Sequence, residues 1–274
     1  MTTVRYIRST LLAFTLAVLC GNAAANEAAC LLIADLREGT IVHLEGQECD
    51  ERIGPASTFK LTLSVMGYDA GILIDPETPA WPYDPSYEAV RQAERVTTTP
   101  RSWMADSVIW YSREVVRRLG AERFAAYTAA LDYGNADVSG DPGANNGMTH
   151  SWLNRSLLIS PREQADFVRR LVLGRLPVAD ASARKAMEAT PEFDAGGGGW
   201  RLRGKTGTGY IREADGQLGR RQFGWFVGWA SDGHRTLVFA HLIKDPSGGK
   251  SAAGPRARDA LLGRWVALAG RRAN

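Results

Sequence analysis

Apolar residues follow two different spacings along the chain, one near both ends and another in the middle. Near the ends they alternate with polar residues or run continuously, and aromatic and β-branched residues are frequent there. Turn-forming residues separate these runs, and the two features together predict β-strands. We expect strands within residues 30–46, 199–211, 221–231 and 235–243.

The middle of the chain and its last segment follow a helical period instead. Apolar residues three and four positions apart predict helices over residues 103–120, 121–134, 160–174 and 256–270. The third of these has a defined start, because Ser160 can cap it, Pro161 suits its first turn and Glu163 completes a capping box. Capping accounts for Glu163 without any catalytic role.

Strands at both ends with helices between them predict a mixed α/β fold of the α+β type. We expect an antiparallel sheet flanked by helices, with an inserted all-helical lobe. The length suits a single domain over residues 26–274, with the sheet lobe in 26–65 and 190–274 and the helical lobe in 66–189. A cleft between the lobes is the expected ligand site.

The first 25 residues are not part of this predicted domain. Arg5 and Arg8 precede the apolar run "LLAFTLAVLC" and the small residues "NAAA", which is typical of a signal peptide and too short to span a membrane. Cys20 suggests a lipoprotein, but Leu19 is bulkier than such sites usually accept, so we favour a periplasmic or secreted protein without a stable membrane partner. Cleavage removes two arginines and no acidic residue, lowering the net charge from +3 to +1. That charge gives no reason to expect nucleic-acid binding.

Two cysteines, Cys30 and Cys49, remain after cleavage and flank the predicted N-terminal strands. In an oxidising compartment we expect a disulfide between them, the alternative being two separate thiols. Neither cysteine has a metal-ligand spacing with a histidine. The four histidines, at 43, 150, 234 and 241, show no triad or metal spacing either. We therefore expect no metal.

Four short motifs carry the candidate chemistry. In chain order they are Ser57-x-x-Lys60, Ser107-Val108-Ile109, Tyr133-Gly134-Asn135 and Lys205-Thr206-Gly207. Each is common by itself. In this order, and on this predicted architecture, they resemble the active-site serine penicillin-recognising enzymes, which have β-lactamase and transpeptidase folds.

Within that superfamily the chain resembles the class D β-lactamases, the oxacillinases. The patterns S-x-V, Y-G-N and K-T-G fit that class, as do "SWLNRSLLIS" and "FGWFVGWA", and the resemblance extends from about Cys30 to the last helix. The group with S-D-N does not fit, because position 109 is isoleucine. Two features depart from class D: Ile109 replaces the usual valine, and the loop between Asn135 and Trp152 is longer than we expect.

The resemblance implies a hydrolase that opens the cyclic amide of β-lactams through an acyl-Ser57 intermediate. Ser57, at a helix N-terminus, would be the nucleophile. Lys60, three residues on, would lie on the same face with its pKa lowered by burial, and carbon dioxide or bicarbonate would carboxylate it into the general base. Ile109 and Leu153 would wall its pocket, and the indole N–H of Trp152 would hold the carbamate.

The remaining motif residues are expected on the substrate side. Ser107 would relay a proton to the lactam nitrogen. Lys205, Thr206 and Gly207 would bind the substrate. The backbone N–H groups of Ser57 and Thr208 would form the oxyanion hole.

An arginine before the last helix is expected to bind the substrate carboxylate. Arg258 fits this role better than Arg256, because the "DALL" that follows it aligns with the start of the last helix in the class D family. Tyr133 and Asn135 would shape the cleft.

Two related functions remain as alternatives. A β-lactam sensor domain or a penicillin-binding protein would be acylated by the same residues but would barely deacylate. Sensors follow transmembrane segments, and penicillin-binding proteins usually carry an anchor or extra domains, so we favour the β-lactamase. The choice among penicillins, cephalosporins and carbapenems stays open at this stage, as does the oligomeric state.

Overall fold

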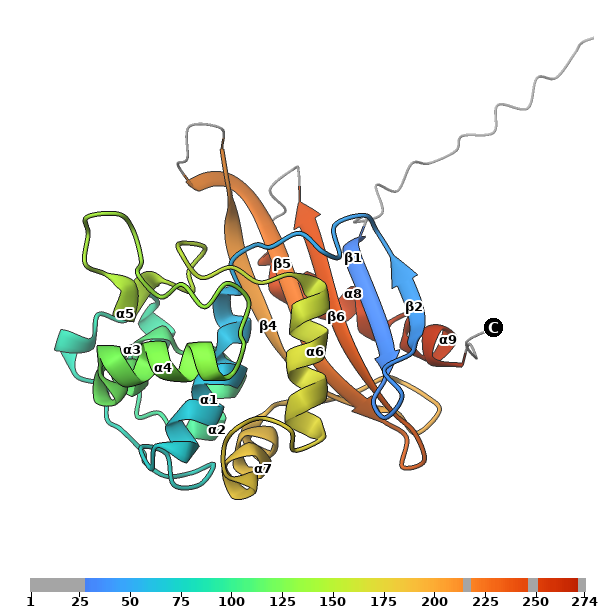
Figure 1. Ribbon diagram of the computed structural model, residues 1–274, viewed down its shortest axis with the longest axis horizontal. Helices are drawn as coiled ribbons and strands as arrows, with labels where there is room; N and C mark the ends of the chain where they lie inside the picture. The colour runs from blue at the N-terminus through green and yellow to red at the C-terminus, as the bar shows by residue number, and fades with distance from the viewer. Residues whose placement is uncertain (1–27, 214–217, 246–250, 271–274) are drawn as a thin grey trace, which may run out of the picture.

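The computed structural model describes residues 28–213, 218–245 and 251–270, and the predicted signal peptide lies outside them (Figure 1). Within these ranges the strands form one antiparallel six-stranded sheet in the order β2-β1-β6-β5-β4-β3. The strands are β1 (Ala28–Asp35), β2 (Ile41–Glu45), β3 (Glu192–Asp194), β4 (Arg201–Arg212), β5 (Leu218–Ser231) and β6 (Thr236–Asp245). The predicted antiparallel sheet, with strands from both ends of the chain, is confirmed.

Helices cover both faces of the sheet. The helices are α1 (Lys60–Asp69), α2 (Pro100–Asp106), α3 (Ile109–Leu119), α4 (Ala121–Ala130), α5 (Gly147–His150), α6 (Pro161–Val172), α7 (Asp180–Ala189), α8 (Ala253–Leu262) and α9 (Trp265–Ala269). Helix α6 lies on one face, α8 lies behind the sheet, and α1 to α5 gather beside β4 (Figure 1).

Burial on both faces explains why the central strands are apolar throughout. In β1, Leu32 belongs to the core on the α6 side, whereas Leu31 and Ile33 belong to the core that contains residues of α8 and α9. Strand β5 is buried continuously from Phe223 to Ala230. Strand β4 lies between β5 and β3 in the sheet and contacts the segment Ala56–Phe59.

Two predicted helices are each broken in two. Residues 103–120 do not form one helix, because Ser107 adopts a left-handed conformation (φ 61°, ψ 38°) between α2 and α3. The C-terminal helix stops at Leu262 and restarts at Trp265. That break lets the Trp265 ring pack 5.5 Å from Phe239 and 5.6 Å from Trp200. Tertiary packing overrides the local helical pattern in both places.

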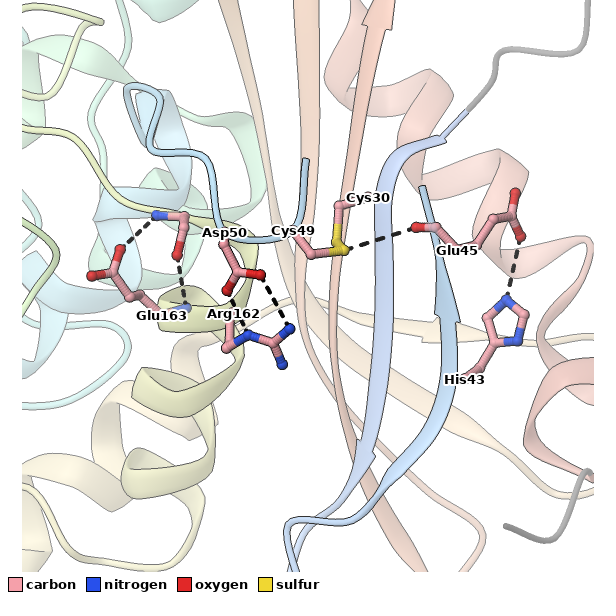
Figure 2. The surroundings of a disulfide bond; sticks show 8 residues. Cys30, His43, Glu45, Cys49, Asp50, Arg162 and Glu163 are labelled. Carbon is pink, nitrogen blue, oxygen red and sulfur yellow. Dashed lines mark hydrogen bonds and ion pairs between the residues drawn. A yellow bond between two sulfur atoms is a disulfide. The ribbon is translucent and has the colours of Figure 1, made fainter. Parts of the chain in front are cut away.

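The capping box predicted for α6 is present. Ser160 Oγ accepts from the Glu163 backbone N–H at 3.2 Å, and Glu163 Oε2 accepts from the Ser160 N–H at 2.8 Å (Figure 2). The Glu163 carboxylate also forms an ion pair with Arg52. These contacts give Glu163 a structural role at the start of α6.

The predicted disulfide joins Cys30 on β1 to Cys49, and both residues are buried (Figure 2). We expect the double substitution Cys30→Ser/Cys49→Ser to lower the free energy of unfolding by about 3 kcal/mol, because the crosslink restricts a loop of about 20 residues in the unfolded chain. Urea denaturation of the oxidised protein and the double variant checks this. A difference below about 0.5 kcal/mol would mean that the bond does not contribute through the unfolded state.

Candidate active site

The site is built around Ser57 and Lys60. Ser57 lies in a short 3₁₀ helix, Ala56–Phe59, that continues directly into α1, whose first residue is Lys60. Lys60 Nζ donates a hydrogen bond to Ser57 Oγ at 3.3 Å. The lysine is only 1% exposed. Helical spacing therefore places a buried amine against the hydroxyl that we expect to react.

The surroundings of Lys60 favour its neutral form. Burial lowers the pKa of Lys60 well below its usual value, and the positive charge of Lys205 lowers it further, whereas the carboxylate of Glu94 acts in the opposite direction. A neutral amine has a free electron pair. It can therefore accept a proton or react with carbon dioxide, which an ammonium ion cannot do.

Ser107 and Lys205 are in contact although they lie far apart in the chain. Lys205, on β4, donates from Nζ to Ser107 Oγ at 3.2 Å and to the Thr206 carbonyl at 3.1 Å. Burial lowers the pKa of Lys205 to about 7, and the cations of Arg91 and Arg258 contribute. A left-handed serine costs on the order of 1 kcal/mol, so the fold must hold Ser107 in this position.

The strand β4 comes very close to the Ser57 turn at Gly207. A Cβ atom added to Gly207 would lie 2.9 Å from the Pro55 carbonyl oxygen and 3.2 Å from the Ser57 backbone nitrogen. Only a glycine permits this approach. The segment before Ser57 is held by the Trp225 indole N–H, which donates to the Gly54 carbonyl at 3.0 Å.

Of the residues expected around Lys60, Trp152 contacts the 3₁₀ helix that contains Ser57. Trp152 is buried and stacks on Phe59 at 5.8 Å, and its carbonyl accepts from the Ala56 N–H at 2.9 Å. Leu153 and Ile109 are half-buried, and Ile109 is the first residue of α3. Trp152 is thus fixed to the segment Ala56–Phe59 through both its ring and its backbone.

The two candidate arginines have different partners. The Arg256 guanidinium donates to the buried carboxylate of Asp245 at 2.6 Å. Arg258 pairs with its exposed neighbour Asp259 and lies over the Phe193 ring at 5.2 Å. An exposed ion pair is weak, so Arg258 is more easily redirected to a ligand than Arg256.

The Tyr133-Gly134-Asn135 motif has a structural role. The Tyr133 hydroxyl donates to Gln164 Oε1 at 3.3 Å, and Gly134 has a positive φ of 59°. The Asn135 side chain donates to the Ser156 carbonyl at 2.8 Å and accepts from the Leu158 N–H at 2.9 Å. The motif therefore anchors the segment that follows Trp152 and Leu153.

The sequence analysis missed Arg91 and Glu94. Glu94 is 1% exposed and accepts from Arg91 Nε at 2.7 Å. Both residues lie in the polar stretch "EAVRQAERVTTT", which has neither helical nor strand periodicity. Nothing in that pattern distinguishes a buried carboxylate from a surface one.

Among residues 28–213, 218–245 and 251–270, no three or more His, Cys, Asp or Glu side chains are grouped as metal ligands. Within the same ranges, no helix has the length and apolar character needed to cross a membrane. The buried His241 is instead held by its Nδ1 atom, 2.9 Å from the Ala257 carbonyl.

Comparison with known proteins identifies first the broad domain family and then the class within it. The chain matches the penicillin binding protein transpeptidase domain over residues 29–262. It is 41% identical over 235 residues to β-lactamase OXA-9 of Klebsiella pneumoniae, a match that covers 85% of each chain. It is 33% identical over 216 residues to β-lactamase OXA-1 of Escherichia coli, covering 78% of this chain and 75% of that one.

The structural comparison agrees. The crystal structure of OXA-427, a class D β-lactamase, superposes with a TM-score of 0.80 at 42% identity, covering 88% of this chain and 98% of that one. The chain belongs to the class D β-lactamases, which hydrolyse cyclic amides with a serine nucleophile and need no metal cofactor.

Proposed function

We propose that this protein hydrolyses the β-lactam amide of penicillins and related antibiotics through an acyl-Ser57 intermediate, with carboxylated Lys60 as the general base. The observation that carries the proposal is the contact of the buried Lys60 Nζ with Ser57 Oγ at 3.3 Å. A serine hydroxyl becomes a useful nucleophile only when an adjacent base takes its proton.

In acylation, the base at position 60 takes the Ser57 proton while Ser57 Oγ forms a bond to the lactam carbonyl carbon. The developing oxyanion is stabilised by the backbone N–H groups of Ser57 and Thr208. The close contact of Gly207 with the Ser57 turn supports this pairing, because Thr208 is the next residue on β4. As the lactam C–N bond breaks, the proton that the base took from Ser57 passes through Ser107 to the leaving nitrogen.

Deacylation needs a base that can take a proton from the hydrolytic water after acylation. Reaction with carbon dioxide converts the neutral Lys60 amine into a carbamate and releases a proton, which supplies an anionic base for both Ser57 and the hydrolytic water. We assign Ile109 and Leu153 to the apolar wall that keeps the lysine out of water, and the indole N–H of Trp152 to the carbamate oxygens. The lowered pKa of Lys60 supports this, since burial keeps the amine neutral.

The substrate carboxylate is bound on the β4 side. Lys205 provides positive charge beside Ser107, and Thr206 and Arg258 complete the anionic subsite. The effect of Arg258 on the pKa of Lys205, after that of burial and of Arg91, supports its place near the subsite.

Export to the periplasm or medium fits the same function. The Cys30–Cys49 disulfide supports an oxidising location, because such bonds are rare in reducing compartments.

Steady-state hydrolysis of a chromogenic cephalosporin by residues 26–274, with and without added bicarbonate, tests the proposal. We expect sustained turnover that increases with bicarbonate, and no acyl-enzyme in Ser57→Ala by mass spectrometry. A single stoichiometric burst that bicarbonate does not extend would contradict it, and would instead indicate a β-lactam sensor or a transpeptidase-like protein.

A further inference from the structure

An ion pair between a buried carboxylate and an exposed arginine belongs to none of the four motifs. Arg91 Nε donates to Glu94 Oε1 at 2.7 Å. The Glu94 side chain is 1% exposed, while that of Arg91 is 55% exposed. Burying a carboxylate is costly unless it is paired and hydrogen-bonded. The burial of the Glu94 carboxylate therefore calls for a specific explanation.

The pair contacts the chain on both sides of Ser107. Arg91 Nη2 donates to the carbonyl of Asp106, the last residue of α2, at 2.8 Å. Glu94 Oε2 accepts from the backbone N–H of Ile109, the first residue of α3, at 3.3 Å. The Glu94 backbone carbonyl also accepts from the Trp110 indole at 2.7 Å. The ion pair thus joins the end of one helix to the start of the next.

Ser107 needs such support because of its conformation. Its φ of 61° is left-handed, a region that a serine seldom adopts. Ser107 follows the last residue of α2, and only the extended Val108 separates it from the start of α3. In that conformation Ser107 Oγ reaches Lys205 Nζ at 3.2 Å. A carboxylate at the N-terminus of α3 is also favourable to the helix dipole. The conformation and the pair are therefore consistent with each other.

We propose that Arg91 and Glu94 are positioning residues for acylation, holding Ser107 Oγ against Lys205 so that Ser107 can protonate the lactam nitrogen. The proposal rests on the proposed function of Ser107. Neither residue contacts the reacting atoms, so both act through the turn at Ser107. The charge of Arg91 also affects Lys205: burial lowers the pKa of Lys205 most, and the Arg91 cation is the next largest cause.

Single substitutions test the positioning role. Arg91→Ala and Glu94→Ala are expected to lower the acylation rate, measured as kcat/KM and by stopped-flow, about 10- to 100-fold, since small misplacements of catalytic groups have effects of that order. Glu94→Gln keeps an acceptor for the Ile109 N–H and is expected to lose less than Glu94→Ala. Arg95→Ala removes an exposed arginine beside Glu94 and is the matched control, with unchanged kcat/KM.

A double-mutant cycle separates positioning from general stability. If the pair acts through Ser107, then Ser107→Ala/Glu94→Ala loses no more acylation rate than Ser107→Ala alone. Losses that multiply, or single variants with wild-type acylation, would overturn the inference. Arg91→Ala, in which a half-exposed side chain is lost, replaces Glu94→Ala in the cycle if the latter does not fold.

The same cycle tells the two proposals apart. If Ser107→Ala itself keeps the wild-type acylation rate, the relay assigned to Ser107 is wrong, and the positioning role fails with it. If Ser107→Ala is slow but the Arg91 and Glu94 variants are not, only the positioning role fails.

Discussion

Turnover of a chromogenic cephalosporin is expected to fall at least about 10³-fold in Lys60→Ala, a loss in the range for removing a general base. The alanine removes the group that contacts Ser57 Oγ at 3.3 Å, and with it the only base that we assign to both half-reactions. Bicarbonate should no longer increase the residual rate. Steady-state kinetics, with mass spectrometry of the acyl-enzyme, checks both statements.

Lys185→Ala, which removes a half-buried lysine of α7, is the control and should keep wild-type turnover. Residual turnover within about tenfold of wild type in Lys60→Ala would exclude Lys60 as the base.

The stability of the folded protein provides a second readout. Burial lowers the pKa of Lys60 in the folded protein. Between this lowered pKa and the ordinary pKa of the unfolded chain, the unfolded chain binds more protons than the folded, uncarboxylated protein. The free energy of unfolding therefore rises with pH in that range. Lys60→Met should therefore melt no lower than the uncarboxylated wild type at pH 7.

The second large effect is expected at Gly207. Gly207→Ala should lower kcat/KM about 100-fold or more, the cost of displacing one oxyanion-hole donor. Its added methyl would lie 2.9 Å from the Pro55 oxygen and 3.2 Å from the Ser57 nitrogen. The turn that contains Ser57 must therefore shift away from β4. The loss should appear in the acylation rate, measured by stopped-flow with the same cephalosporin.

Gly197→Ala is the matched control, because its added methyl would meet only Val266 Cγ2, at 3.6 Å. It should retain both kcat/KM and melting temperature. If Gly207→Ala retained wild-type acylation, the contact between β4 and the Ser57 turn would have no role in stabilising the oxyanion.

Much of the fold could be predicted because its signals are local. The period of apolar residues places the long strands and most helices, and the capping box of Ser160 and Glu163 specifies the start of α6. The short strand β3 and the helix α7 were not predicted. Strand β3 is only three residues long, too short for a clear pattern. Helix α7 packs against α1, which lies far earlier in the chain.

The site was predictable only where motifs mark it. Ser57 and Lys60 are one helical turn apart, so their contact follows from spacing. The left-handed Ser107 does not follow from its neighbours, because the surrounding residues favour one continuous helix. Its conformation depends on Lys205, 98 positions away, and on the contacts of Arg91 and Glu94. No local pattern indicates that Glu94 is buried.

The strand order has a consequence for how the protein folds. Within the sheet β1 pairs with β6, for example Leu32 with Ala240, so partners about 200 residues apart must meet before the sheet can close. Until β6 is available, the apolar strand β1 has an unpaired edge that can pair with other chains. Aggregation during refolding should therefore depend on how fast the C-terminal strand joins, and a chain ending before β6 should be insoluble even though Ser57, Lys60, Ser107 and Lys205 are all present.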